Sequence, residues 1–325
     1  MNKRIKILLG WLITLYFLFL TLSKLDFLQI ISQLHLVNLN WIFGAVIILV
    51  VDYALRIIRW WLMFRSTEFK PPFWLCCRFF LIGNALNNFL PLRAGDIYRI
   101  VEFSNQSRIP SSTVFATVAV ERIFDVSSLL ILLYLGISGD VGNIIFSNFP
   151  TEIQDAIKLL TISCFILVLS LLLLPSQIKK MLEFLIKYIS IPSKIYNFIF
   201  STLVSIQNLL SLSRVTYLII FSIFVWFIEA LAYGAIQSSL SLELPINAML
   251  ISNTFATIST LFPSSPGYIG TFHYFAALSL SVFGVSAIVA ASFAIVMHSL
   301  LWITVSSFGF MAYLVAYLNR NTKKI

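Results

Sequence analysis

The sequence predicts an all-α integral membrane protein with about six full crossings and two broken or re-entrant helical segments. Hydrophobic residues make up 59% of the 325 positions and charged residues only 11%, which lies outside the range of soluble globular domains. Apolar runs of about 20 residues, the length that crosses a bilayer, recur along the chain. Lysines and arginines gather in separate clusters between these runs. These observations leave room for no sizeable soluble domain within these residues.

Six apolar runs are long enough to cross the bilayer, and we expect crossings at 5–23, 41–64, 111–136, 156–174, 215–240 and 286–317. The first run follows Lys3, Arg4 and Lys6, as in a secretory signal peptide, but no small-residue cleavage site comes after it. We therefore expect an uncleaved first span.

Two further apolar runs, 73–90 and 247–284, contain proline and glycine breaks. If each run crossed the membrane once, the lysines and arginines would no longer gather on one side of it. We therefore expect broken or re-entrant helices, the first over 73–100. Irregular backbone at membrane depth is tolerated only where protein or a water-filled cavity satisfies its polar groups. Both segments are therefore expected in the interior.

The two broken segments share an order of residues: an apolar pair, a small residue and an asparagine, then a proline with a glycine four positions later. The matching stretches are LIGN at 81–84 with Pro91 and Gly95, and LISN at 250–253 with Pro263 and Gly267. If they enter from opposite sides, the halves 1–174 and 215–325 are related by an inverted-topology repeat, a common transporter plan. Two ordinary kinked helices that look alike are the alternative.

The net charge of +9 follows membrane topology rather than a nucleic-acid-binding surface. If the N-terminal basic residues are cytoplasmic, the basic clusters at 65–108, 179–214 and 320–324 also fall inside. The opposite side then holds two lysines and five carboxylates: Lys24, Lys158, Asp26, Asp140, Glu152, Asp155 and Glu243. We expect both termini in the cytoplasm and the protein in the cell (plasma) membrane.

Residues 175–214 are the longest polar interval, and their apolar residues recur at helical spacing on both sides of Pro192. Lysines, among them Lys179 and Lys187, flank this apolar stripe. The pattern predicts a pair of amphipathic helices on the cytoplasmic leaflet, with the lysines near anionic headgroups. Partner binding is the alternative.

The first broken segment is unusually polar for its depth. It carries three asparagines, two arginines and an aspartate around its break: Asn84, Asn87, Asn88, Pro91, Arg93, Gly95, Asp96 and Arg99. Proline stops the helix and glycine permits a tight turn, so backbone groups stay unpaired there. Arginine makes forked hydrogen bonds to phosphate, which predicts an anion site. Interfacial arginines that follow the positive-inside rule are the alternative.

Glu121, Arg122 and Asp125 lie in the span that follows, where an ionised group costs about 2.5–3.5 kcal/mol on insertion scales. Their spacing puts both carboxylates on one helix face and lets Arg122 pair with Asp125. One arginine against two carboxylates leaves an excess negative charge unless Arg93 or Arg99 approaches or a proton is bound. Glu121 or Asp125 is therefore a predicted proton-coupling group, with a structural ion pair as the alternative.

Other spans also carry polar residues. Asp52, Arg56 and Arg59 share a face of the second span, and we expect the arginines to extend to the interface beside a local carboxylate. Glu229 has no local partner, so it should face the interior and either pair with an arginine or stay protonated. Glu229 and His298 are predicted cavity-lining groups, although a hydrogen-bonded interior imidazole is the simpler interpretation of His298.

The second broken segment carries the sequence PSSPGYIGTFH at 263–273. Its predicted site residues are Ser264, Ser265, Gly267 and His273, and its helix-breaking residues are Pro263, Pro266 and Gly270. The exposed N–H groups of a broken helix suit a headgroup, and an unperturbed histidine titrates near neutrality. An ordinary extracellular turn is the alternative.

No metal or cofactor site is predicted. Cys76, Cys77 and Cys164 lie in apolar runs without metal-ligand spacing, and we expect them to be packing residues. No phosphate-binding loop for a nucleotide occurs in the sequence, so a proton or substrate gradient is the expected driving force for any transport.

These motifs, in this order, resemble the lysylphosphatidylglycerol synthase transmembrane-region family, a flippase-like family that includes the membrane half of the bacterial multiple peptide resistance factor. The matching features are Asn84, NFLPLRAGD at 88–96, Arg99, Glu121-Arg122 with Asp125, and PSSPG at 263–267 with Gly270. The resemblance covers nearly the whole chain. The family commonly has Gly-Gly after the second proline and an acidic residue three positions after the next glycine, where this chain has Tyr268 and His273.

The resemblance implies translocation of lipid or lipid-linked headgroups between leaflets, through a polar cavity built by the two broken segments. Expected partners are membrane lipids, anionic or carrying a lipid-linked phosphate, and a separate synthase or transferase; no nucleic acid is expected. The soluble aminoacyl-transferring domain of fused members is not among these residues, so we expect no synthesis of lysylated lipid by this chain alone.

Two alternatives to a lipid transporter stay open. One is a membrane-embedded transferase acting on a polyprenyl-linked or phospholipid headgroup, which would use a lipid-linked donor because no Asp-x-Asp metal pair occurs. Glu121, Asp125 or His273 would then be the candidate bases. The other is an accessory subunit that anchors a separate synthase through the basic helices at 179–213.

Overall fold

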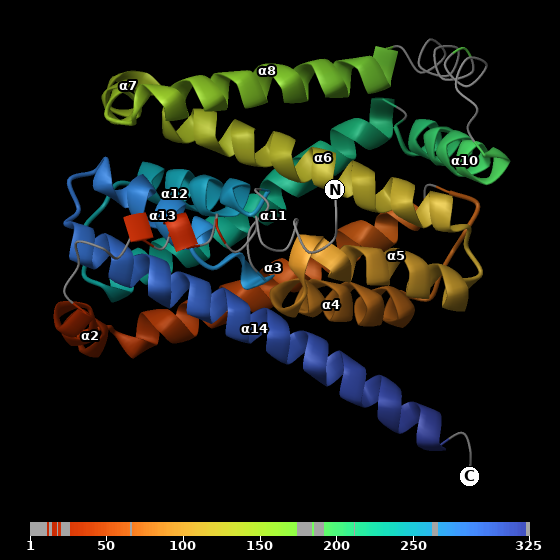
Figure 1. The fold of residues 1–325 in the computed structure, drawn as a ribbon, viewed down its shortest axis with the longest axis horizontal. Helices are drawn as coiled ribbons and strands as arrows, with labels where there is room; N and C mark the ends of the chain where they lie inside the picture. The colour runs from red at the N-terminus through yellow and green to blue at the C-terminus, as the bar shows by residue number, and fades with distance from the viewer. Residues whose placement is uncertain are drawn as a thin grey trace.

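The computed structural model describes residues 27–65, 67–173, 192–210, 212–261 and 266–322, with residue 184 and single residues between 12 and 20. All regular secondary structure in these residues is helical, as the composition predicts (Figure 1). The predicted first crossing at 5–23 falls mostly outside this part of the chain.

Four helices in the described part are long and apolar enough to cross a membrane: α3 (Leu39–Arg65), α8 (Thr151–Leu173), α11 (Leu212–Ser239) and α14 (Ala287–Thr322). Each overlaps one of the crossings predicted from the sequence. A fifth helix, α6 (Ser111–Gly136), has the bounds predicted for another crossing, but its charged residues make it less apolar than these four. Those charged residues contact other helices rather than lipid, as described below.

Three shorter helices lie beside or between the long ones: α2 (Phe27–His35), α7 (Gly139–Ser147) and α10 (Ser193–Leu209). Helix α10 begins after Pro192, where the second amphipathic helix is predicted. It packs against α6 and buries Ile206 and Leu209. Its apolar stripe is therefore partly covered by protein. The first predicted amphipathic helix lies outside the described residues.

The first broken segment consists of α4 (Phe73–Phe89), a short 3₁₀ turn over Pro91–Arg93, and α5 (Ala94–Ser107). Pro91 interrupts the backbone hydrogen bonding, and the next two residues adopt left-handed conformations, with φ of 58° at Leu92 and 53° at Arg93. Helices α4 and α5 then pack side by side. Their contact is so close that a Cβ on Gly95 would lie 2.0 Å from the Gly83 carbonyl oxygen.

The second broken segment has the same construction. Helix α12 (Ile246–Ser259) is followed by a 3₁₀ turn over Pro266–Tyr268 and by α13 (Thr271–Ser281), which packs beside α12. Here too a proline precedes two left-handed residues, Gly267 at φ 71° and Tyr268 at φ 60°. In backbone terms Pro266 and Gly270 therefore correspond to Pro91 and Gly95. The sequence analysis matched Gly267 to Gly95, three residues earlier, and its matched proline, Pro263, lies outside the described residues.

The two breaks meet near the middle of the molecule, where the 3₁₀ turns contact each other and the second also contacts α4. Helix α14 runs along both helical pairs: His298 faces the second break, and Gly309 lies against Ala85 and Leu81 of α4. In the same way α6 packs on α5 with one half and on α12 with the other (Figure 1). Helices α3 and α11 pack on each other and close the remaining side.

Candidate functional site

A cavity of about 160 Å³ lies where the two breaks meet. The first broken segment contributes three asparagines and the arginine of its tip. The second contributes two threonines at the end of α12, Gly267 and two aromatic residues, and helices α3, α6, α11 and α14 supply the rest. The lining residues are Tyr53, Arg56, Asn84, Asn87, Asn88, Arg93, Arg122, Trp226, Glu229, Tyr233, Thr257, Thr260, Gly267, Tyr268, Phe272, His298, Leu301, Trp302 and Val305.

Two of the three asparagines join the end of α4 to neighbouring helices, and the third bonds within α4. Asn84 donates to the Phe80 carbonyl at 2.8 Å, and Asn88 donates to Ser306 Oγ of α14 at 3.0 Å. Asn87 donates to an Asp96 carboxylate oxygen at 3.3 Å, which joins the two helices across the break. The side-chain oxygen of Asn87 is buried and has no hydrogen-bond partner among the described residues. Each asparagine thus uses donors for structure while its side chain borders the cavity.

Arg93 lies at the first break, in a left-handed conformation one residue before α5. Its guanidinium donates to the Thr260 hydroxyl at 2.9 Å, at the end of α12. The Tyr268 ring centroid lies 5.9 Å from the guanidinium carbon. Among the residues that the structure describes, Arg93 has no carboxylate partner. A cation at membrane depth without a counter-charge favours an anionic ligand.

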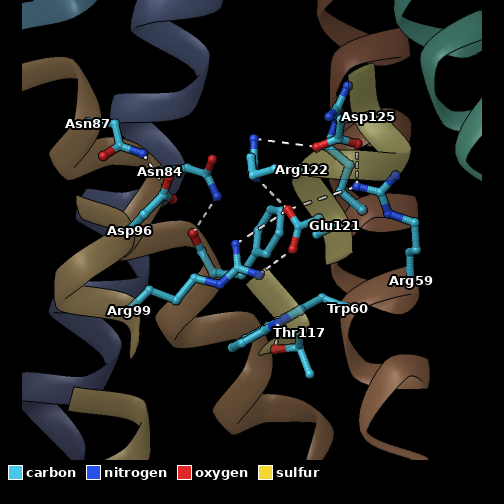
Figure 2. Close-up of polar contacts among 12 residues, drawn as sticks. Arg59, Trp60, Asn84, Asn87, Asp96, Arg99, Thr117, Glu121, Arg122 and Asp125 are labelled. Atoms are coloured by element: carbon cyan, nitrogen blue, oxygen red, sulfur yellow. Dashed lines mark hydrogen bonds and ion pairs between the residues drawn. The ribbon is translucent and has the colours of Figure 1, made fainter. Parts of the chain in front are cut away.

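Behind the cavity wall, α3, α5 and α6 hold a network of buried ion pairs (Figure 2). Arg99 is completely buried, donates to Glu121, and its guanidinium carbon lies 3.9 Å from the Trp60 ring centroid. Glu121 also pairs with Arg122 at 2.6 Å and more distantly with Arg59 at 3.9 Å. The structure therefore makes Arg99 the partner of Glu121 rather than a residue of the cavity wall.

Asp125 forms a second node of this network. Its Oδ1 accepts from Arg59 at 2.7 Å and from the Trp226 indole nitrogen at 2.9 Å, while Arg122 lies 3.4 Å from Oδ2. Arg59 also donates to Ser222 of α11 at 2.8 Å. The pairing of Arg122 with Asp125 was expected from their spacing. The contribution of Arg59, from a helix far away in sequence, was not.

Arg56 connects α3 to α11. It pairs with Asp52 at 2.7 Å and with Glu229, and its guanidinium carbon lies 4.0 Å from the Trp226 ring centroid. Glu229 is thus paired with an arginine, one of the two states predicted for it. The expectation that Arg56 and Arg59 extend to the interface is wrong, because both are buried, at 8% and 2% exposure. Their carboxylate partners on α6 and α11 hold them inside.

The buried charges balance. Four arginines and four carboxylates take part, in two groups that Trp226 connects: Arg56 with Asp52 and Glu229, and Arg59, Arg99 and Arg122 with Glu121 and Asp125. The sequence analysis left one negative charge uncompensated on α6. The structure adds two arginines from α3 and α5 there, and the first group has the one excess negative charge that balances the second. A balanced network avoids the large cost of an unpaired charge in a low-dielectric interior.

The second break brings two histidines together. The His298 Nε2 lies 2.7 Å from the Gly267 carbonyl oxygen, and the His273 Nδ1 accepts a bond from the Gly270 N–H at 3.4 Å. The two ring centroids are 4.6 Å apart. His298 lines the cavity, whereas His273 lies behind it at the start of α13.

The structure divides the described residues that were predicted for the site into three groups. Asn84, Asn87, Asn88, Arg93, Arg122, Glu229, Gly267 and His298 line the cavity. Asp96, Arg99, Glu121, Asp125 and His273 lie behind its wall, while Pro91, Gly95, Pro266 and Gly270 shape the breaks. Pro263, Ser264 and Ser265 lie outside the described residues.

The sequence analysis missed most of the aromatic wall, including Tyr53, Trp226, Tyr233 and Trp302. The sequence did carry a signal for two of them. The spacing of three and four residues puts Trp226 and Tyr233 on the same face of α11 as Glu229. In the described part of the chain no group of three or more histidine, cysteine, aspartate or glutamate side chains is placed to hold a metal ion.

Comparison with known proteins gives one family and two relatives. The family model described as the lysylphosphatidylglycerol synthase TM region matches residues 7–309. Glycosyltransferase AglD of Haloferax volcanii is 28% identical over 148 residues, 44% of this chain and 24% of that protein. UPF0104 membrane protein MJ1078 of Methanocaldococcus jannaschii is 26% identical over 196 residues, 58% of this chain and 76% of that protein. The match thus spans about a quarter of the first relative's length. No solved structure matches.

Proposed function

Because the chain belongs to the lysylphosphatidylglycerol synthase transmembrane-region family, we propose that it moves a phosphate-bearing lipid or lipid-linked headgroup between the two leaflets of a cell membrane. The headgroup passes through the cavity between the two breaks while the acyl or polyprenyl chains stay in lipid. The partners of the protein are anionic membrane lipids and a separate synthase or transferase, which supplies or uses those lipids.

The observation that carries this proposal concerns Arg93 and Arg122, two of the three arginines that line the cavity. Arg93 lines it without a carboxylate partner among the described residues, and Arg122 lines it with a buried Nε that has no hydrogen-bond partner there. Guanidinium groups bind phosphate oxygens through forked hydrogen bonds. The N-terminal ends of α5 and α13 lie at the two breaks, and helix N-termini also favour anions. These features suit a phosphate better than a neutral or cationic cargo.

Transport between leaflets also requires access from both sides. We propose six full crossings with both termini in the cytoplasm, and two broken segments that enter from opposite faces as an inverted repeat. The order long helix, broken pair, long helix occurs twice, as α3 to α6 and as α11 to α14. Both breaks share the backbone of a proline followed by two left-handed residues. An inverted repeat places its binding site at this junction, near the bilayer midplane.

The test is lipid movement in vesicles that contain the purified protein. Wild-type protein is expected to expose an acyl-labelled anionic phospholipid from the inner leaflet to an external quencher, well above the rate in protein-free vesicles. Arg93→Ala is expected to lose most of this activity, whereas Arg78→Ala, outside the cavity, keeps it. Folded wild-type protein that moves no lipid across a panel of anionic and polyprenyl-phosphate probes would contradict the proposal.

A membrane-embedded transferase is the second candidate, because one relative is a named glycosyltransferase. That similarity covers 44% of this chain and 24% of the relative. In the part of the chain that the structure describes, Glu229 is the one carboxylate on the cavity wall, and it would be the base. Mass spectrometry of lipids from cells with and without Arg93→Ala separates the two functions. A chemically altered lipid that disappears in the variant supports a transferase, and unchanged lipid chemistry supports transport.

A further inference from the structure

The four carboxylates of the buried network differ in how many cations depend on them. Glu121 is the one carboxylate that the structure pairs with Arg99, and it also contacts Arg122 and Arg59. Asp125 accepts from Arg59 and from the Trp226 indole and lies near Arg122. A proton on either would leave at least one buried guanidinium short of its main partner, which is costly in a low-dielectric interior.

Glu229 differs from Glu121 and Asp125 because its arginine partner has a second carboxylate. Its one ion-pair partner in the described part of the chain is Arg56, and Arg56 keeps a second carboxylate, Asp52, at 2.7 Å. A proton on Glu229 would therefore leave no arginine unpaired. A proton on Asp52 instead of Glu229 is less favourable, since Asp52 is completely buried and does not line the cavity from which the proton would come.

Among the described residues Glu229 is also the one carboxylate on the cavity wall, where it is 6% exposed and where a proton from water and an incoming anion reach the same space. The other titratable or charged groups on that wall are Tyr53 and Arg56 from α3, Arg93 and Tyr268 from the breaks, Arg122 from α6, Tyr233 from α11 and His298 from α14. Among these groups the arginines stay cationic at any physiological pH, and an unperturbed tyrosine stays neutral. Glu229 and His298 are thus the two proton-carrying groups to compare.

Binding an anion disturbs the balance of charges. The charges of the network sum to zero, and Arg93 and Asp96, which no described contact joins, add one charge of each sign. A headgroup with one phosphodiester brings a single negative charge that Arg93 can contact. The site as a whole then has one negative charge in excess unless a proton enters with the headgroup. Protonation of Glu229 removes that excess and releases Arg56 to face the phosphate while Asp52 still neutralises it.

We propose that Glu229 is a proton-carrying group that couples movement of each monoanionic phosphodiester headgroup to one proton travelling in the same direction. This inference rests on the proposed transport function. A proton from the aqueous phase adds to the Glu229 carboxylate as the headgroup enters, and it leaves to the opposite aqueous phase as the headgroup departs. No bond of the lipid is made or broken, and the cycle carries no net charge.

The test uses the full-length protein in phosphatidylcholine vesicles with a trace of acyl-labelled phosphatidylglycerol and an internal pH-sensitive dye. With one-to-one coupling, a pH difference of one unit drives the leaflet ratio of the probe toward about 10-fold. Probe movement is expected to carry protons that the dye records. A membrane potential set by valinomycin and potassium is expected to leave the ratio unchanged. Soluble glycerol phosphate as competitor distinguishes recognition of the phosphate from recognition of the lipid.

Three variants complete the test. Glu229→Gln keeps a group that accepts from Arg56, so it is expected to fold and to lose both proton movement and the response to the pH difference. Glu243→Gln removes an exposed carboxylate from the turn after α11 and is the matched control. His298→Gln is expected to keep coupling. The protein's thermal unfolding in detergent reports whether each variant is folded.

The outcomes separate the two proposals. Wild-type protein that moves no probe contradicts the transport function itself. Wild-type protein that moves probe without protons, or that responds to membrane potential, overturns the coupling while transport stands. Coupling that survives Glu229→Gln but fails in His298→Gln assigns the proton to the histidine and also overturns the inference. The wild-type measurements decide the coupling even if the Glu229 variant does not fold.

Discussion

Arg93 and Arg99 belong to the same broken segment but have different surroundings. Arg93 contacts a threonine hydroxyl and borders the cavity, whereas Arg99 is completely buried against Glu121, Trp60 and Phe80. The sequence predicted one role for both, because helical spacing gives the face of a residue but not the distance to another helix. The residue types were predictable, and their division between wall and network was not.

Removal of Arg93 is expected to affect transport more than stability. Arg93→Ala deletes charge-assisted hydrogen bonds to the headgroup, each worth about 1.5–3 kcal/mol, so transport should fall by roughly 10- to 100-fold. Its unfolding temperature in detergent should change little, since the variant leaves no carboxylate unpaired. Arg93→Lys keeps the charge without the forked geometry and should recover part of the activity. Equal activity of Arg93→Ala and wild-type protein would contradict this role.

Removal of Arg99 is expected to affect stability more than transport. Arg99→Met leaves Glu121 without its most buried partner, and breaking a buried pair costs about 3–5 kcal/mol. The variant should therefore unfold at a clearly lower temperature. The double variant Arg99→Met with Glu121→Gln should recover part of this stability, because it also removes the negative charge that Arg99 compensated. A single Arg99→Met variant as stable as wild-type protein would show that the pair is not buried as described.

At the scale of helices, the positions of the breaks were easier to predict than the backbone conformation within them. Proline and glycine mark where α4 ends and α13 begins, and α6 has the bounds that its apolar run predicted. The structure adds that Leu92 and Arg93 are left-handed without being glycine, which costs about 1–2 kcal/mol per residue. The sequence carries no local signal for this, because the surrounding contacts impose the conformation.

The close contact of α4 and α5 makes a specific prediction. Gly95→Ala would place a methyl group 2.0 Å from the Gly83 carbonyl oxygen, so the helices must separate. Overpacking of this kind costs about 1–3 kcal/mol and should lower the unfolding temperature. Gly44→Ala is the control, because nothing lies within 4 Å of its added Cβ in α3. It should stabilise the helix by about 0.5–1 kcal/mol. Gly95→Ala with unchanged stability and transport would contradict the packing.

At the scale of the whole molecule, the predicted order of segments agrees with the helices of the described part. The assembly did not follow from sequence. Pairing of α3 with α11, and contact of α14 with both broken pairs, join residues far apart along the chain. Apolar periodicity identifies the face of a helix that is buried but not the helix that covers it. For this reason the sequence predicted that Glu229 either pairs with an arginine or stays protonated, but it did not identify Arg56 as the partner.

The inverted topology predicts opposite sides for two loops. Glu68 precedes α4 and Glu243 precedes α12, so in a variant with its three native cysteines replaced, Glu68→Cys should react only from the cytoplasmic side. Glu243→Cys should react only from the opposite side. Labelling of intact cells with a membrane-impermeant maleimide, before and after permeabilisation, measures this. Reaction of both cysteines from one side would rule out the inverted repeat.

The balanced ion pairs have a consequence for how the protein is made. Within the network α3 and α5 each contribute one excess positive charge, and α6 and α11 each contribute one excess negative charge. Arg56 has Asp52 on its own helix, so the excess charge of α3 is that of Arg59, whose partner Asp125 is 66 residues further along the chain. At about 5–20 residues per second, a ribosome needs roughly 3–13 s to synthesise that interval. During this time the nascent α3 carries one uncompensated positive charge, which favours its retention near the translocation machinery until α6 emerges.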